Sequence, residues 1–210
     1  LATADDEGAV GFSISFDDAA GNAGVAVTAV TDGTSVTLDD TAPTLTSVSI
    51  DSNNAETDAT DETAIDGNTV TLTFTASETI QSPTCTFTSG GNAMEDVTVA
   101  VVNTDEDQWT CMLDVTDTDT DGAVGFSIAF TDSAGNAGTA VTSTSDSTSV
   151  TIDNTHPTLS PVSIATAGTG NANDGDVITL SFTSSETIGT PTCTIYDGTN
   201  GDYMDNSVTA

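Results

Sequence analysis

Carboxylates and side-chain amides are the groups in this sequence with the clearest chemical potential. The 210 residues include 33 Asp or Glu, one His and no Lys or Arg, which gives a formal net charge of −33. Oxygen-rich sets of this kind suit a hard cation such as Ca²⁺, which takes about six to eight oxygen ligands. The candidate ligands lie in predicted turns and linkers, and they are Asp39, Asp40, Glu78, Asp105, Asp132, Asn136, Asp153, Asn154 and Glu186.

The missing basic residues exclude several function classes. Without Lys or Arg, the chain has no cationic surface for nucleic acid or anionic lipid, and no lysine for a Schiff base or a phosphate-binding loop. Paired carboxylates suited to glycoside cleavage arise by chance in so acidic a chain, so they carry no information. His156, whose counterpart in the repeat described below is Ala42, is expected to be an exposed linker residue. We therefore expect no enzymatic activity.

Blocks of sequence recur along the chain. Residues 8–24, GAVGFSISFDDAAGNAG, return as residues 122–138, displaced by 114 positions. Residues 72–85 return as residues 180–193, displaced by 108 positions. The difference arises in the acidic stretch over residues 51–65, where an insertion predicts a surface loop. The sequence therefore predicts repeats of 108–114 residues.

The repeat divides the chain into three predicted parts. Residues 43–156, the central repeat, form one complete module. Residues 1–42, the N-terminal segment, correspond to the C-terminal part of a preceding module. Residues 157–210, the C-terminal segment, correspond to the N-terminal half of the next. The chain is then either a window on a continuous array, which we favour, or a short subunit that assembles into a filament by exchanging half-domains.

The three cysteines follow the same repeat. Cys85 and Cys111 lie in the central repeat, and Cys193 repeats Cys85, with its own partner expected beyond residue 210. We predict a Cys85–Cys111 disulfide, with two buried thiols as the alternative. A disulfide indicates an oxidising, extracytoplasmic setting.

Apolar and polar residues alternate through the central repeat, with the period of half-buried β-strands. The alternation predicts seven strands, over residues 45–50, 70–76, 84–88, 97–102, 108–115, 124–131 and 139–152. The residues expected to face inward are Val70, Leu72, Phe74, Cys85, Phe87, Trp109, Cys111, Leu113, Val124, Phe126, Ile128 and Phe130. This pattern predicts an all-β fold of tandem immunoglobulin-like β-sandwich modules. The disulfide would join the third and fifth strands across the two sheets.

The turn and linker motifs resemble those of a known family. Residues 130–138 read FTDSAGNAG and residues 150–157 read VTIDNTHP, with the twin VTLDDTAP at residues 36–43. An Asp-x-Ala-Gly-Asn turn followed by Val-Thr-x-Asp-x-Thr-x-Pro resembles the bacterial-type Ig-like repeats of very large surface adhesins. The resemblance implies a segment of an extracellular stalk, fibre or adhesin shaft at the cell surface, of the kind often rigidified by calcium between modules.

In an Ig-like sandwich, the loops after strands two, four and six return to the end where the chain enters. This topology would bring Glu78, Asp105 and Asp132 to the linker residues Asp39 and Asp40. We predict a Ca²⁺ site there. The alternative is that the Asp and Asn residues only hydrogen-bond their own turns. The same prediction for the following junction names Asp153, Asn154 and Glu186.

A secondary candidate calcium loop consists of Asp117, Asp119 and Asp121, at the opposite end of the module. The spacing matches the start of an EF-hand loop, but Ile128 stands at the twelfth position where Glu is required, so we reject an EF-hand. A solvated turn is the alternative for this loop.

Neighbouring Ig-like repeats, of the same or identical chains, are the expected partners. The alternative function is a module that binds a glycan or another surface ligand, and residues 51–65 are the candidate segment because they differ between copies. The Ser and Thr residues within 142–148 are candidates for O-glycosylation, or simply ordinary turn composition.

Overall fold

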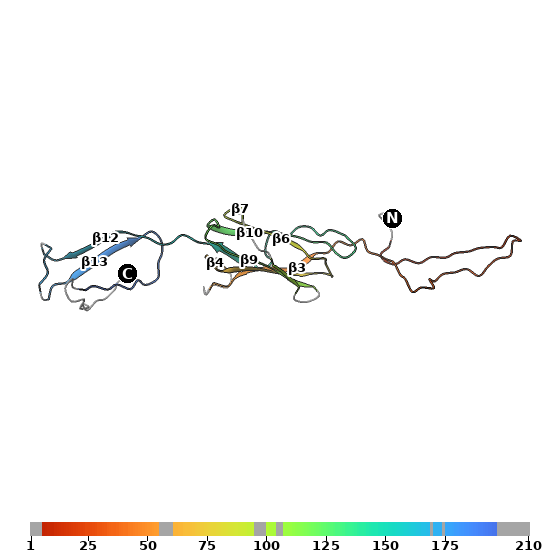
Figure 1. The fold of residues 1–210 in the computed structure, drawn as a ribbon, viewed down its shortest axis with the longest axis horizontal. Coiled ribbons are helices and arrows are strands. Elements are labelled where there is room, and N and C mark those ends of the chain that lie inside the picture. The colour runs from red at the N-terminus through yellow and green to blue at the C-terminus, as the bar shows by residue number, and fades with distance from the viewer. Residues whose placement is uncertain are drawn as a thin grey trace. The chain divides into compact units, whose positions relative to one another are not determined.

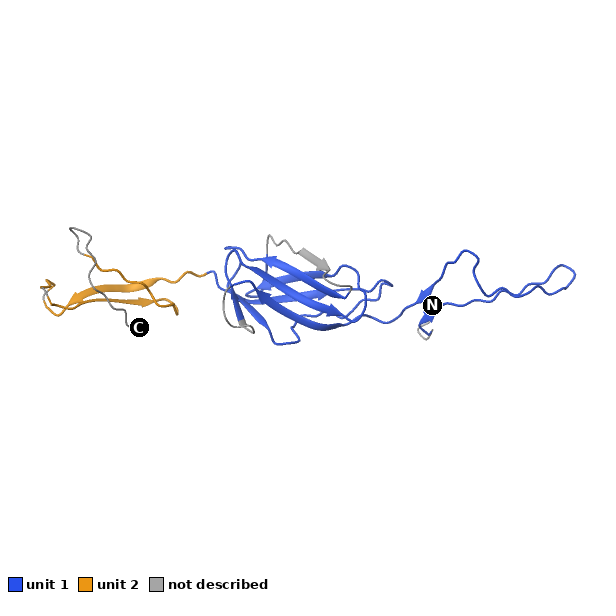
Figure 2. Ribbon diagram, turned by 90° about the horizontal axis from the view of Figure 1, so that it is seen from below, with its two compact units in different colours: residues 1–154 blue, residues 155–210 orange. Residues whose placement is uncertain are grey.

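The computed structural model of the chain describes residues 6–54, 61–94, 100–103, 107–168, 170–173 and 175–196. Over these residues the protein is all-β, and they include no helix that could span a membrane. The chain divides into two compact units, residues 1–154 and residues 155–210 (Figure 2).

The strands of the central repeat belong to two sheets (Figure 1). They are β3 (Leu45–Ser52), β4 (Asp61–Ala64), β5 (Thr69–Ala76), β6 (Thr84–Ser89), β7 (Asn92–Ala93), β8 (Ala100–Asn103), β9 (Gln108–Asp114), β10 (Gly122–Ala129) and β11 (Ser149–Ile152). One sheet has the order β4-β11-β10-β6-β7, and the other has the order β3-β5-β9-β8. Neighbouring strands are antiparallel, except for β11 and β4, which run parallel.

One buried cluster contains side chains from both sheets. Its large apolar members with at most 1% exposure are Phe74, Leu72, Leu113, Ile128, Ile152, Val70 and Val150. The inward-facing residues predicted from the sequence all belong to this cluster, although Val124 and Phe126 are only partly buried against it. Because the apolar faces of two sheets share one core, the arrangement is consistent with a β-sandwich.

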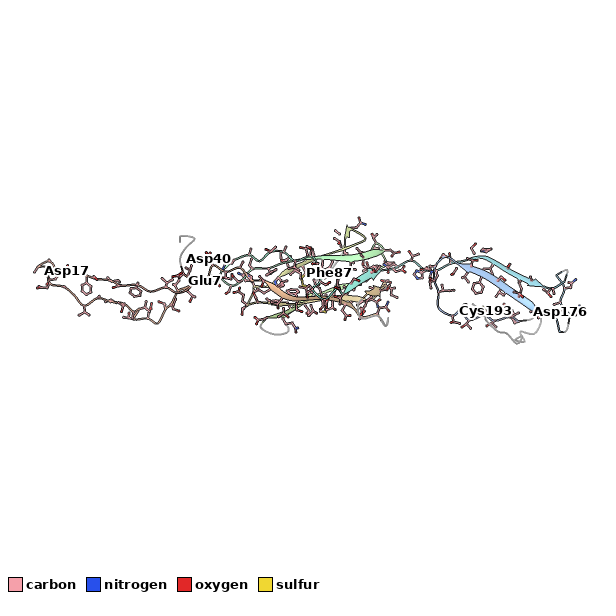
Figure 3. All side chains as sticks on the ribbon, turned by 180° about the vertical axis from the view of Figure 1, so that it is seen from behind. Glu7, Asp17, Asp40, Phe87, Asp176 and Cys193 are labelled. Carbon is pink, nitrogen blue, oxygen red and sulfur yellow. A yellow bond between two sulfur atoms is a disulfide. The ribbon has the colours of Figure 1, made fainter. Side chains whose placement is uncertain are left out.

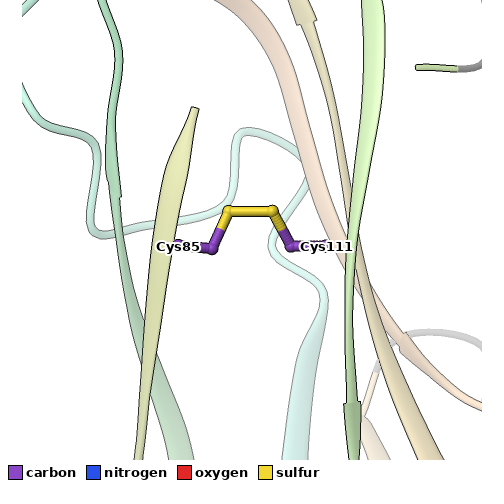
Figure 4. The surroundings of a disulfide bond; sticks show 2 residues. All are labelled: Cys85 and Cys111. Carbon is purple, nitrogen blue, oxygen red and sulfur yellow. A yellow bond between two sulfur atoms is a disulfide. The ribbon is translucent and has the colours of Figure 1, made fainter. Parts of the chain in front are cut away.

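A disulfide crosses from one sheet to the other, which confirms the predicted pairing (Figure 4). Cys85 in β6 and Cys111 in β9 have Cα atoms 6.4 Å apart, and both residues are buried. Closing a loop of this size stabilises a fold by about 3 kcal/mol, because it restricts the unfolded chain. Cys193 lies in the second compact unit, outside this bridge.

The predicted strand over residues 139–152 is wrong in its first part, since regular pairing is confined to Ser149–Ile152. A turn interrupts it. The Asp146 carboxylate accepts hydrogen bonds from the backbone N–H of Thr148 at 3.1 Å and from its hydroxyl at 2.8 Å. Ser147 has a φ of 68°, a conformation that ends an extended strand.

The interrupted segment lies along β3, an edge strand of its sheet. The Ser145 N–H donates to the Val48 carbonyl at 2.8 Å, and the Val48 N–H donates to the Ser145 hydroxyl at 3.0 Å. The Ile50 N–H donates to the Thr148 hydroxyl at 3.0 Å. These contacts occupy backbone groups that would otherwise be open to pairing with another strand.

The acidic stretch over residues 51–65 is not simply the surface loop that the sequence predicts. Residues 51 and 52 extend β3, and residues 61–64 form β4, which pairs with β11 so that Ala64 lies opposite Ile152 and is fully buried. Of the predicted strand over residues 97–102, residues 100–102 belong to β8, and residues 97–99 lie outside the described residues.

The N-terminal segment repeats the backbone pairing of residues 122–152. Strand β1 (Gly8–Ala9) pairs with β2 (Thr37–Leu38), with Gly8 opposite Leu38. In the central repeat, Gly122 lies opposite Ile152, 114 positions later in both strands. The isolated bridge between residues 14 and 27 likewise corresponds to the bridge between residues 128 and 141.

The C-terminal segment repeats the pairing of β3 with β5. Strand β12 (Leu159–Thr166) pairs with β13 (Ile178–Ser184), with Val162 opposite Phe182 and residue 164 opposite residue 180. The corresponding pairs in the central repeat are Val48 with Phe74 and residue 50 with residue 72. Both flanking segments therefore share strand registers with parts of the central repeat.

Candidate cation site at the linker

Three carboxylates from distant parts of the sequence converge where the chain enters the central repeat. Asp39 lies in the linker after β2, Glu78 follows β5, and Asp132 follows β10. Each offers one carboxylate oxygen, and these atoms all lie within 4.8 Å of one another. Asp132 is fully buried, and the other two are half-buried. We call these three residues the linker cluster.

Hydrogen bonds from backbone and side-chain groups hold the Glu78 loop against both of its neighbours. The Ser77 N–H donates to the Thr44 carbonyl at 2.8 Å, and the Thr44 N–H donates to the Ser77 hydroxyl at 3.0 Å. On the other side, the Gln81 side-chain amide donates to the Asp132 carbonyl at 2.8 Å. The loop is thus connected to the linker at one point and to the Asp132 turn at another.

The Asp132 carboxylate organises its own turn. One of its oxygens accepts the backbone N–H groups of Gly135 at 2.6 Å and Asn136 at 2.8 Å, and the other accepts the Asn136 side-chain amide at 2.8 Å. Burial by itself raises the pKa of Asp132, but the hydrogen bonds from Asn136 and its neighbours together outweigh that effect and lower it. The buried carboxylate is therefore ionised at neutral pH.

Asn136 connects this turn to the linker. Its side-chain amide donates to the Asp39 carbonyl at 3.1 Å as well as to the Asp132 carboxylate. The Asp-x-Ala-Gly-Asn motif therefore does more than stabilise its own turn, because the same amide also holds the backbone of the linker.

Glu78 experiences repulsion from the surrounding carboxylates. Burial raises its pKa, and the negative charges of Asp39, Asp132 and Glu7 raise it further. The chain has no Lys or Arg to offset this repulsion. A cation from solution is the species that would neutralise such a site.

Glu7 is a member of this neighbourhood that the sequence analysis missed. Figure 3 shows Glu7 beside the linker residue Asp40. The Glu7 carboxylate accepts the Asp40 backbone N–H at 3.2 Å and the Thr41 hydroxyl. In the central repeat, the Asp121 carboxylate accepts the Asn154 N–H at 2.7 Å, and these residues are the counterparts of Glu7 and Asp40. The signal was available, since the far end of one repeat adjoins the near end of the next.

Two other residues predicted for this site contribute differently. Asp40 supplies its backbone N–H to Glu7, and its carboxylate does not belong to the linker cluster. Asp105 lies outside the described residues.

The secondary candidate loop, residues 117–121, hydrogen-bonds the linker residue Asn154, which follows β11. The Asp119 carboxylate accepts the Thr116 N–H at 2.7 Å, and Asp121 accepts the Asn154 N–H as described above. Over the described part of the chain, Asp117, Asp119 and Asp121 do not gather into a group with the spacing of the linker cluster. A cation at this loop stays a prediction.

The residues predicted for the following junction divide between the two compact units. The Asn154 amide donates to the Thr116 carbonyl at 2.9 Å, and the Asn154 side-chain oxygen accepts the Asp66 N–H at 2.8 Å. The Asp153 N–H donates to the Ala64 carbonyl at 3.0 Å. Glu186 belongs to the second unit, so a site shared by these residues stays a prediction.

Comparison with protein-family models finds no match to this chain, and none of the curated proteins compared with it matches. The chemical interpretation of the linker cluster therefore depends on the geometry and charges described above. Three ionised or ionisable carboxylates with no basic neighbour form a donor set for a hard, oxygen-preferring cation.

Proposed function

We propose that the chain is a structural segment of a long extracellular stalk, fibre or adhesin shaft. It consists of tandem Ig-like β-sandwich modules, and Ca²⁺ stiffens it where one module meets the next. The observation that carries this proposal is the linker cluster, in which Asp39 of the linker meets Glu78 and Asp132 of the module within 4.8 Å.

The module part of the proposal is supported by the strand registers. The N-terminal segment pairs its residues as the end of the central repeat does, and the C-terminal segment pairs its residues as the start does. A disulfide that joins the two sheets of a sandwich is also a feature of antibody-type Ig domains. Repetition of one structural unit favours a mechanical role, because an enzyme needs one distinct site.

The extracellular part of the proposal is supported by the Cys85–Cys111 disulfide. Disulfides persist in oxidising environments and are rare in the cytosol. Free Ca²⁺ is also abundant enough outside cells to occupy weak sites, with dissociation constants of roughly 10⁻⁴–10⁻³ M in extracellular modules.

A bound cation would stiffen the junction because it would connect the linker to the module. Asp39 precedes the central repeat, while the other two ligands are fixed to its β5 and β10 ends. A cation bound to all three restricts the backbone torsions of the linker between residues 39 and 44. Each of the three carboxylates supplies at least one oxygen, and water completes the coordination that Ca²⁺ requires.

The test compares the melting temperature of the full chain in CaCl₂ and in EDTA. Ca²⁺ at about 100 times its dissociation constant would add about 2.7 kcal/mol to the free energy of unfolding. Glu78→Gln should lose most of this gain, and it should be at least as stable as the unmodified chain in EDTA because the repulsion is relieved. The matched control is Asp51→Asn, which removes the same charge from an exposed position on β3.

The test is decisive because Glu78→Gln should be less stable than the unmodified chain in CaCl₂ but at least as stable in EDTA. If Glu78→Gln merely damaged the fold and had no effect on calcium binding, its melting temperature would be lower than that of the unmodified chain in both CaCl₂ and EDTA. Identical melting curves in CaCl₂ and EDTA, with identical small-angle scattering profiles, would contradict the calcium part of the proposal.

A further inference from the structure

The chain leaves the central repeat through a residue whose side chain binds two separate turns. Asn154 follows β11 and is half-buried. Its side-chain oxygen accepts the N–H of Asp66, in the turn between β4 and β5, at 2.8 Å. Its side-chain amide donates to the Thr116 carbonyl at 2.9 Å and to the Asp119 carbonyl at 3.3 Å, in the connection between β9 and β10. One side chain therefore joins the end of β11 to both turns.

The backbone at this point is held to the module as well. The Asn154 N–H donates to the Asp121 carboxylate at 2.7 Å. The preceding N–H, that of Asp153, donates to the Ala64 carbonyl at 3.0 Å. This second bond continues the parallel pairing of β4 with β11, in which Ala64 lies opposite Ile152. The linker therefore starts from a fixed point on the module.

The acceptors that surround the Asn154 side chain are fixed by bonds of their own. The Asp119 carboxylate accepts the Thr116 N–H at 2.7 Å and the Thr116 hydroxyl at 3.2 Å, which closes the turn that supplies the two carbonyls. The turn between β4 and β5 is joined to the same connection, because the Gly67 N–H donates to the Val115 carbonyl at 3.0 Å. The amide thus meets a preorganised set of acceptors, so little further ordering opposes its binding.

The counterpart of Asn154 in the first linker is Asp40. The Asp40 N–H donates to the Glu7 carboxylate at 3.2 Å, as the Asn154 N–H does to Asp121. An ionised carboxylate only accepts hydrogen bonds, whereas a side-chain amide also donates them. The backbone contact is therefore possible with either residue, but the bonds to the two carbonyls require Asn.

We propose that Asn154 is the positioning residue of the outgoing linker, and that its side-chain amide fixes the direction in which the chain leaves the module, independently of Ca²⁺. The inference rests on the tandem-module part of the proposed function, in which a linker joins one module to the next, and it does not require the calcium part. Asp at this position keeps the backbone contacts and loses the amide contacts. The choice between Asn and Asp thus sets how firmly a linker is held by the module that precedes it.

NMR relaxation of the backbone ¹⁵N nuclei of the full chain, measured in EDTA, tests this role. The order parameters of Thr155 and His156, which follow Asn154, should be near the value of about 0.85 that is typical of rigid backbone. Asn154→Asp should lower both to about 0.6, because its carboxylate cannot donate to the two carbonyls and adds negative charge beside their oxygens. Asn154→Ala, which removes the amide without adding a charge, should lower them too.

Asn53→Asp is the matched control. The Asn53 side-chain oxygen accepts the Thr69 N–H at 2.8 Å, and Asp retains that acceptor while adding the same charge. The order parameters of Thr155 and His156 should keep their unmodified values in this variant. The fluorescence of Trp109, the only Trp, reports whether the central repeat is folded at the temperature of the measurement. A loss of order in a folded module then concerns the linker rather than the fold.

Several outcomes would overturn the proposal. Order parameters of Thr155 and His156 below about 0.6 in the unmodified chain in EDTA would do so without any variant. Unchanged values in folded Asn154→Asp and Asn154→Ala, or equal losses in Asn53→Asp, would do so too. A rise to rigid values only after CaCl₂ is added would show that a cation holds this linker instead. The calcium test uses the melting temperature of Glu78→Gln, so either proposal can fail without the other.

Discussion

Residues 8–38 and 122–152 have nearly the same sequence and the same strand pairing, yet they differ in burial. Phe16 is 52% exposed and its counterpart Phe130 is 5% exposed, while Val36 is 66% exposed and Val150 is 1% exposed. Among the described residues, those of 122–152 pack against the other strands of the central repeat, and those of 8–38 do not contribute to that core. The comparison separates local structure, which both copies form, from core formation, which requires the partner strands.

The turns in the two regions share their Asp–Asn hydrogen bonds, although the Asp18 carboxylate also accepts the Ala20 N–H and the Asp132 carboxylate also accepts the Gly135 N–H. The Asp18 carboxylate accepts the Asn22 backbone N–H at 2.8 Å and the Asn22 side-chain amide at 2.7 Å, which are the bonds that Asp132 makes with Asn136. The Asn22 side chain is the main cause of the lowered pKa of Asp18. At Asp132, burial is the largest single influence and opposes the hydrogen bonds. The turn is thus a local property, and only its environment changes.

The largest expected difference between the regions comes from core truncation. Ile128→Ala should lower the free energy of unfolding of the central repeat by about 2–5 kcal/mol, because the fully buried side chain leaves a cavity. Ile14→Ala should leave that free energy within about 0.5 kcal/mol of the unmodified value. Urea titration followed by Trp109 fluorescence measures both. Similar losses from the two variants would mean that the N-terminal segment shares the core of the central repeat.

A smaller difference is expected at two matched glycines. A Cβ atom at Gly138 would lie 2.2 Å from the Phe130 ring, and one at Gly24 would lie 2.2 Å from the Phe16 ring. Gly138→Ala should cost about 1–3 kcal/mol, because the buried Phe130 ring has no room to move.

Gly24→Ala should not change the stability of the central repeat, because the half-exposed Phe16 ring can move into solvent. Thermal unfolding of the two variants, side by side, provides the measurement. A neutral Gly138→Ala would show that the core around Phe130 is loosely packed.

The smallest expected difference concerns pH in the absence of calcium. The pKa of Glu78 is raised above its ordinary 4.5, so the folded state holds more protons there, and acidification from neutral pH towards 4.5 adds stability. The pKa of Asp132 is lowered below its ordinary 3.8, so its stabilisation is present above that pH and is lost as the pH falls through the folded pKa.

Melting temperatures between pH 3 and pH 7 in EDTA check these signs. Glu78→Gln should show a smaller gain on acidification than the unmodified chain does. Asp18→Asn, at the counterpart of Asp132, should follow the unmodified profile. A profile for Glu78→Gln identical to that of the unmodified chain would contradict the predicted repulsion.

Strand positions and the disulfide were predictable from local pattern, since alternation identifies which side of a strand faces the core. The same pattern wrongly predicted a continuous strand over residues 139–148. There, Asp146 forms a turn with Thr148, and the neighbouring hydroxyls bind the edge of β3 instead of continuing a strand. Polar residues that pair with a distant edge strand leave no periodic signal.

The linker cluster was predictable in part. The expected sandwich topology brings the loops of Glu78 and Asp132 to the linker residue Asp39, and the structure brings the carboxylates of these three residues together. Glu7 was not predicted as a member, because its nearness to Glu78 depends on how one repeat follows another. No spacing within a single repeat contains that information.

By itself, the sequence determined most of the strands, the Asp-x-Ala-Gly-Asn turns and the excess of negative charge, because these depend on neighbouring residues and composition. The exceptions are residues 61–64 and 139–148, where pairing with distant strands decides the structure. Only the tertiary structure decided which of two nearly identical segments is buried and, among the carboxylates of the described residues, that Asp39, Glu78 and Asp132 meet. The physical reason is that burial and like-charge repulsion are set by through-space neighbours. In this protein, those neighbours come from parts of the chain far apart in sequence.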